Sequence, residues 1–124
     1  MLIPSDFFTI LEQMSKRGYL GEMELMVLLA VMRLNDDAYG VPISKELLIL
    51  AGREVALGSI YAALERLTQK GFVTSSLGEP TPERGGRAKR YFRVTPAGVR
   101  ALRTTRTALI NLWSGIPLLE GTRT

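Results

Sequence analysis

The stretch from residue 56 to residue 73 constrains the fold more than any other part of the chain. Its apolar side chains recur on one helical face at Ile60, Leu64 and Leu67. Gly71 follows the last turn of this pattern, which predicts a helix over residues 58–70 that stops at the glycine. Phe72 and Val73 come next and favour a β-strand. We therefore expect a short amphipathic helix that leads directly into a strand.

Length and composition limit the classes of protein to which the chain can belong. With 124 residues, of which 46% are hydrophobic and 23% charged, the chain has the size and composition of one globular domain. The longest apolar run, Leu25 to Met32, is eight residues and is too short to cross a membrane. The N-terminus lacks a basic region ahead of an apolar core, so we expect no secretory signal and a cytoplasmic location.

Cysteine and histidine are both absent from the sequence, which excludes several kinds of chemistry. Disulfides, zinc sites built on sulfur or imidazole, and Cys–His or Ser–His–Asp nucleophiles cannot form. Carboxylate-only chemistry and Ser–Lys dyads remain open in principle, but the usual general base is missing. We therefore expect no enzyme activity, no metal site and no cofactor.

Charge is unevenly distributed along the chain. The formal net charge is +4, but residues 1–52 carry four Lys/Arg against seven acids and residues 53–124 carry twelve against five. The first part therefore has a net charge of −3 and the second a net charge of +7. A one-sided basic field favours a polyanion, nucleic acid first and an anionic membrane surface second, although it can also serve solubility alone.

Helices and strands are predicted on both sides of the central helix. Helices are expected over residues 5–15, 22–34, 42–51 and 96–113, and strands over residues 72–78 and 88–94. Thr95 is the expected N-cap of the last helix, with Pro96 at its first position. Leu50 and Leu57 are expected in the core, and residues 53–55 form a connector or a brief strand.

The two strands and the loop between them, residues 72–94, form a segment that we call the wing. Its loop, residues 78–87, is rich in proline and glycine. Five cations and no acid lie in its second half, namely Arg84, Arg87, Lys89, Arg90 and Arg93. Because a solvated loop rarely excludes acids so completely, these cations are predicted to contact nucleic acid as a group.

The order helix, helix, helix, hairpin, helix is that of a winged helix-turn-helix, and the chain resembles the PadR-like family of bacterial transcriptional regulators. The resemblance covers about residues 20–114 and lies in the segments GSIYAALERLTQKGFV (58–73), AYG (38–40) and GRAKRYFRVTPAG (86–98). It implies a mostly α-helical fold with a β-hairpin wing and with N- and C-terminal dimerisation helices. Pro42 departs from the family pattern, in which a helix-forming residue is expected after the Tyr-Gly pair.

The resemblance also implies a domain organisation and a function. We expect an N-terminal helical extension (1–19), a winged helix DNA-binding domain (20–95), a C-terminal dimerisation helix (96–115) and a tail (116–124). The single C-terminal helix is similar to that of the short branch of the family. The expected function is that of a homodimeric repressor that binds a palindromic operator in double-stranded promoter DNA and is released by a small aromatic or drug-like effector. No membrane partner is expected.

Predicted DNA contacts come from the segment that leads into the third helix, from the central helix and from the wing. They are Tyr39, Ser59, Tyr61, Ala62, Glu65, Arg66, Gln69, Lys70, Arg84, Arg87, Lys89 and Arg90. Arg66 and Lys70 can contact either phosphates or guanine edges. Glu65 can read cytosine or only repel the DNA backbone in a wrong register. Tyr39 and Tyr61 have packing as their alternative role.

The terminal helices are predicted to form the dimer. The expected interface consists of Phe7, Phe8, Leu11, Leu102, Arg106, Leu109, Ile110 and Trp113. Arg106 interrupts the apolar stripe, so it must reach water or pair with a carboxylate such as Glu12. Trp113 and Phe8 are candidates to contact an aromatic effector, with packing without a ligand as the alternative.

A winged-helix protein-interaction module without specific DNA binding is the alternative function. In that case the apolar terminal helices would bind a protein partner. The wing argues against this alternative, because a protein-docking surface has no need of five cations without an acid.

Overall fold

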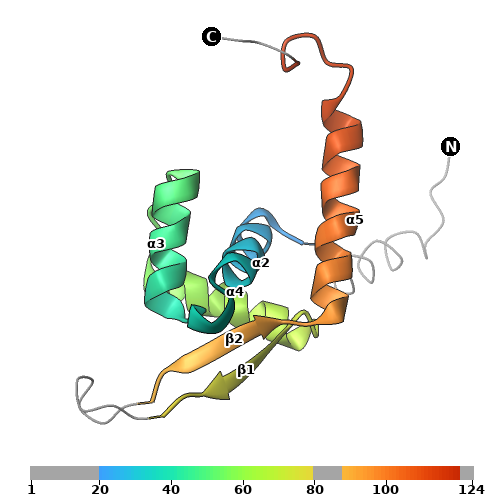
Figure 1. Ribbon diagram of the computed structural model, residues 1–124. Coiled ribbons are helices and arrows are strands. Elements are labelled where there is room, and N and C mark those ends of the chain that lie inside the picture. The colour runs from blue at the N-terminus through green and yellow to red at the C-terminus, as the bar shows by residue number, and fades with distance from the viewer. Residues whose placement is uncertain (1–19, 80–87, 121–124) are drawn as a thin grey trace, which may run out of the picture.

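The computed structural model describes residues 20–79 and 88–120, and Figure 1 gives the arrangement of their elements. In chain order these are α2 (Glu22–Leu34), the 3-10 helix η1 (Asn35–Asp37), α3 (Gly40–Ala51), α4 (Leu57–Gln69), β1 (Val73–Leu77), β2 (Arg90–Val94) and α5 (Pro96–Trp113). The fold is mostly helical with one two-stranded antiparallel hairpin, as predicted. The expected N-terminal helix over residues 5–15 and extension over residues 1–19 lie outside the described residues.

The α3 helix begins at Gly40, which is earlier than the expected start at residue 42. Tyr39 is its extended N-cap, and the backbone N–H of Ile43 makes the first helical hydrogen bond to the Tyr39 carbonyl at 3.1 Å. Pro42 therefore lies in the first turn, where a missing N–H removes no helical hydrogen bond. Residues 53–55 form a connector and no strand.

The core of the described residues lies where α2 crosses α4. Its fully buried side chains include Val27, Leu28 and Val31 of α2 and Ile60, Leu64 and Leu67 of α4. In Figure 1, α2 lies between α3 and α5 while α4 runs beneath it. The apolar side of α2 is thus largely covered, but Leu29 and Met32 remain exposed.

Two predicted core residues are exposed, which corrects the sequence interpretation. Leu50 is 57% exposed because it lies at the C-terminal end of α3, beside an open groove of about 170 Å³ between α3 and α2. Leu57 is 43% exposed because it is the first residue of α4 and precedes the part of this helix that packs on α2. Helical periodicity places both residues on apolar faces but cannot show where a neighbouring element ends.

The wing is anchored to the helices at its base and extends away from them in Figure 1. Its strands pair from Val73 opposite Val94 to Leu77 opposite Arg90. The backbone N–H of Phe92 donates to the Ala38 carbonyl at 2.9 Å, so β2 is also bound to the turn that precedes α3. Phe92 itself is buried in the core and its ring lies beside that of Tyr61, which fixes the hairpin against α2 and α4.

Thr95 joins the wing to α5. Its hydroxyl oxygen accepts from the Gly98 N–H at 3.1 Å and its hydroxyl group donates to the Gly71 carbonyl at 2.6 Å. Its own N–H donates to the Phe72 carbonyl at 2.9 Å. The predicted N-cap at Thr95 and the proline at the first helical position are confirmed. None of the helices in residues 20–79 and 88–120 is long and apolar enough to span a membrane.

Candidate nucleic-acid interface

The α4 helix presents one buried and one exposed face. Ile60, Ala63, Leu64 and Leu67 form the buried face. Because successive helical residues are rotated by about 100°, the residues opposite this face form a single line along the helix. We call this line the outer strip, and it consists of Gly58, Ala62, Glu65 and Gln69, all of which are exposed. The strip carries one acid and no cation.

Tyr61 lies on the flank of α4 that faces the wing. Its phenol contacts the backbone of Gly40 so closely that a Cβ atom at that position would overlap the ring and the hydroxyl oxygen. Its ring centroid is 6.5 Å from that of Phe92 in β2. Tyr61 is nevertheless 42% exposed, so the packing that orients the ring leaves part of it open to a ligand.

A second aromatic cluster joins the start of α3 to the wing. Tyr39 and Tyr91 meet edge to face with ring centroids 5.4 Å apart. The Lys89 ammonium lies 4.5 Å above the Tyr39 ring and donates to its hydroxyl oxygen at 3.3 Å. Tyr39 thus packs against Tyr91 and also holds the wing cation Lys89. Both of its predicted roles, packing and DNA contact, therefore remain open.

The remaining wing cations are held at different places. Arg90 donates to the Ser75 hydroxyl at 3.1 Å across the hairpin. Arg93 pairs with Asp36 at 2.8 Å, with both side chains largely exposed. Arg84 and Arg87 lie outside the described residues. Of the predicted wing contacts, Lys89 and Arg90 are thus placed at the surface beside α3 and α4.

A cleft of about 440 Å³ separates α4 from the wing. It is lined by Tyr61, Glu65, Thr68, Gln69, Ser75, Arg90 and Phe92. The cleft brings together four predicted DNA contacts, three from α4 and one from β2, namely Tyr61, Glu65, Gln69 and Arg90. It also contains the hydroxyl groups of Thr68 and Ser75, which no sequence pattern indicated. Thr68 donates to the Leu64 carbonyl at 2.8 Å within α4. The Ser75 hydroxyl and the Arg90 guanidinium along this cleft are groups that bind a phosphate backbone.

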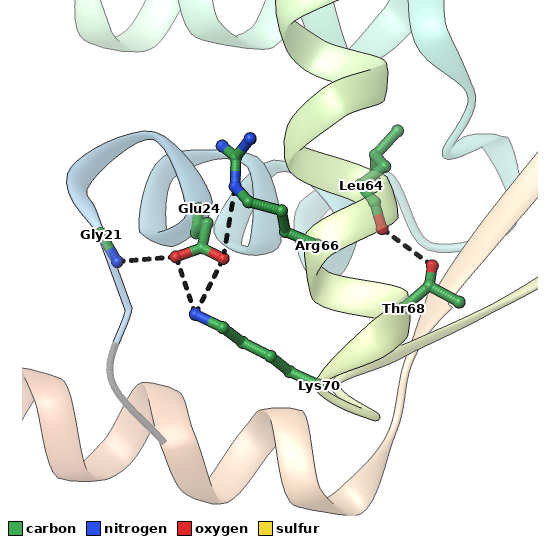
Figure 2. Close-up of polar contacts among 6 residues, drawn as sticks. All are labelled: Gly21, Glu24, Leu64, Arg66, Thr68 and Lys70. Carbon is green, nitrogen blue, oxygen red and sulfur yellow. Dashed lines mark hydrogen bonds and ion pairs between the residues drawn. The ribbon is translucent and has the colours of Figure 1, made fainter. Parts of the chain in front are cut away.

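Arg66 and Lys70 lie on the other flank of α4 and face α2 (Figure 2). The Lys70 ammonium is 3.0 Å from each carboxylate oxygen of Glu24, and the Arg66 Nε is 3.7 Å from Oε2. Glu24 Oε1 also accepts from the Gly21 N–H at 2.9 Å, at the start of α2. We call these residues, Gly21, Glu24, Arg66 and Lys70, the Glu24 cluster. It connects the N-terminus of α2 to the C-terminal half of α4.

Glu24 is the buried charged residue of the described part of the chain, and its side chain is only 7% exposed. A buried carboxylate requires partners, because its removal from water costs several kcal/mol. This role of Glu24 is not among the sequence predictions. The available signal was the acid Glu24, two residues after the expected start of the helix and directly before its apolar run.

Four of the five predicted dimer residues of α5 share one groove. Leu102, Arg106, Leu109 and Ile110 line an apolar groove of about 470 Å³ together with Leu25, Leu29 and Met32 of α2. Leu102 also belongs to the core of the chain itself. Trp113 is 58% exposed at the end of α5. Phe7, Phe8 and Leu11, and the suggested Arg106 partner Glu12, lie outside the described residues.

Two helices joined by a short turn, α3 and α4, followed by a two-stranded wing, define a winged helix-turn-helix DNA-binding protein. Residues 28–104 match the model of a family described as the transcriptional regulator PadR-like family. The chain belongs to this family. Its members are transcriptional regulators and not enzymes, so this chain is a DNA-binding regulator.

Solved structures give the same fold. A PadR family transcriptional regulator from Eggerthella lenta DSM 2243 is 25% identical, with a TM-score of 0.62, over 94% of this chain and 96% of that one. A PadR family transcription regulator from Clostridium difficile R20291 is 19% identical, with a TM-score of 0.63, over 82% of this chain and 100% of that one. A transcriptional regulator from Clostridium thermocellum is 23% identical, with a TM-score of 0.64, over 79% and 92%. Comparison with curated proteins gives no match.

Proposed function

We propose that the protein is a cytoplasmic repressor that binds a palindromic promoter operator as a homodimer. The observation that carries this proposal is the arrangement of the outer strip of α4 beside the wing. The strip is exposed along its whole length, and the cleft next to it is lined by Arg90, Ser75 and Tyr61, which supports a DNA backbone as its ligand. An exposed helix with basic and hydroxyl groups at its side suits a major groove.

The α5 helix supports the homodimer. From Arg106 onward every described residue of the chain is exposed, including Leu109, Ile110 and Trp113. In Figure 1 this half of α5 extends beyond the other helices. A helix that leaves large apolar side chains in water is stabilised when a second copy covers them. A two-fold dimer would present two α4 helices to successive major grooves, about 34 Å apart.

The same region supports a small-molecule effector. The groove of about 470 Å³ between α2 and α5 is mainly apolar, and the Arg103 and Arg106 side chains lie among its lining residues. Trp113 offers an exposed aromatic face near the end of the same helix. An aromatic effector bound there would change the distance between the two α4 helices and thereby release the operator.

The experiment is a binding titration of the purified chain with DNA from upstream of its own gene and with a scrambled duplex of equal length. We expect at least about 100-fold tighter binding to the upstream DNA. Analytical ultracentrifugation should give the mass of a dimer, alone and on DNA. Equal affinity for both duplexes would contradict a specific regulator and favour the protein-interaction alternative, and a monomer on DNA would contradict the homodimer.

A further inference from the structure

We infer that α4 reads bases through Ala62, Glu65 and Gln69, while Glu24 holds Arg66 and Lys70 at the side of the helix, away from guanine. This inference rests on the proposed function and specifies the base chemistry of the operator. It assigns Glu24 the role of a positioning residue, which acts on DNA recognition through the two cations that it holds.

The contacts of Lys70 indicate that this residue does not reach the bases. Its side chain is only 16% exposed, and its ammonium is 3.0 Å from both oxygens of a carboxylate that is itself 7% exposed. To reach a base, Lys70 would have to leave a buried negative charge without this partner, which is strongly unfavourable.

The position of Arg66 indicates that this residue contacts phosphates and not bases. Its Nε is 3.7 Å from Glu24 Oε2, and its side chain is 51% exposed. Figure 2 shows the guanidinium beside Glu24 on the α2 flank of α4. A guanidinium at this flank is placed for the phosphates along one edge of a major groove, whereas bases in the middle of the groove face the outer strip.

The outer strip then determines which bases are read. The Gln69 amide has the donor and the acceptor that match adenine N7 and N6. The Glu65 carboxylate only accepts, so it matches the N4 amine of cytosine and disfavours the O6 and N7 acceptors of guanine. Ala62 offers a methyl group for the methyl group of thymine. The chemistry thus predicts contacts to adenine, cytosine and thymine and none to guanine N7.

The test begins with selection of a preferred duplex from a randomised palindromic library by the full chain. Duplexes are then made with 7-deazaadenine or 7-deazaguanine, which lack the major-groove N7 acceptor, at each position of the half-site. We expect 7-deazaadenine at one position to lower affinity about 10-fold, and 7-deazaguanine to change it less than about 2-fold at every position. Neither 7-deazaadenine nor 7-deazaguanine changes the minor groove, so contacts of the wing to the minor groove are unaffected.

Variants show which residue causes each change in affinity on base substitution. Gln69→Ala should abolish the sensitivity to 7-deazaadenine, whereas the matched control Arg53→Ala, which removes an exposed guanidinium paired with Glu22, should retain it. Arg66→Ala should weaken binding to every duplex by a similar factor and leave base preference unchanged. Glu24→Gln, which removes the negative charge that holds both cations, should create a new sensitivity to 7-deazaguanine, an effect that a loss of stability alone does not produce.

Clear results would overturn the inference. A wild-type sensitivity to 7-deazaguanine that disappears in Arg66→Ala would show that Arg66 reads guanine. A selected half-site without adenine or cytosine in the major-groove contact region would exclude Gln69 and Glu65 as readers. If Glu24→Gln does not fold, the wild-type and Arg66→Ala measurements still decide the question. A library that yields no preferred sequence contradicts the proposed function itself, and the base-reading inference with it.

Discussion

The phenol of Tyr61 in α4 packs directly on the backbone of Gly40, the first residue of α3. The contact is so close that only a residue without a side chain can occupy position 40 while Tyr61 keeps its orientation. The two helices of the helix-turn-helix are thus held together at the surface that faces the cleft, and the direction of the Tyr61 hydroxyl group depends on a residue in another helix.

Gly40→Ala should therefore disturb DNA binding more than stability. The atoms that a new methyl group meets belong to the far end of a side chain that is 42% exposed, so the ring can swing outward. We expect a loss of about 1 kcal/mol in the free energy of unfolding, measured by urea denaturation. The loss of DNA affinity should equal that of Tyr61→Ala, and the double variant should bind no more weakly than either single variant. Additive losses of affinity would contradict a shared effect through the phenol.

Gly98→Ala should be much more damaging to stability. A Cβ atom at this position would meet the Phe72 carbonyl and the Val94 side chain, and a backbone group cannot move aside as a side chain can. We expect a loss of about 3 kcal/mol, seen as a lower urea midpoint. Gly58→Ala is the matched control, because nothing lies within 4 Å of the added methyl group in α4. Its helix propensity should raise stability by about 0.5–1 kcal/mol.

Glu24→Leu should destabilise the protein by about 2 kcal/mol, because Lys70 loses a partner in a mostly buried position. This is less than for a fully buried pair, since the Lys70 side chain retains 16% exposure and Arg66 can turn to water. The double variant Glu24→Leu with Lys70→Met should recover most of this loss in urea denaturation, because both buried charges are then gone. A double variant no more stable than Glu24→Leu would show that the Glu24–Lys70 pair is not the cause.

Lys89→Met should lower the salt dependence of DNA binding. Lys89 lies at the surface against Tyr39, and removal of one phosphate contact reduces the slope of log affinity against log salt by about 0.9. The slope is measured by fluorescence anisotropy at several salt concentrations. Arg33→Met is the control, because its guanidinium pairs with Glu46 at 3.0 Å on α3, beside the groove with α2. An equal change of slope in both variants would remove Lys89 from the interface.

Local patterns were sufficient to predict most of the elements. The helix expected over 58–70 is observed over Leu57–Gln69, and the last helix begins at Pro96 with its Thr95 cap, because amphipathic periodicity and capping residues act over a few neighbouring residues. The start of α3 was predicted too late. Pro42 is the third residue of the helix and not the first, because a proline fits any position of the first turn, where no N–H takes part in a helical hydrogen bond.

The candidate site was predictable in its composition but not in its geometry. The sequence grouped Arg66 and Lys70 with the other α4 residues because all are polar and lie on one helix. Their direction depends on Glu24, which is 46 residues from Lys70 in the chain. Such a long-range ion pair leaves only a weak local trace, an acid in an apolar helix. The predicted DNA contacts themselves remain predictions.

A single residue, Thr95, separates the last strand of the wing from α5, and three hydrogen bonds fix it to Gly71, Phe72 and Gly98. The strand β2 and the helix α5 are therefore fixed to each other and to the two residues that follow the end of α4. In the proposed dimer, a rotation of the distal half of α5 would move β2 with it. The spacing between the two operator half-sites that the dimer can bind would then depend on the angle between its two α5 helices.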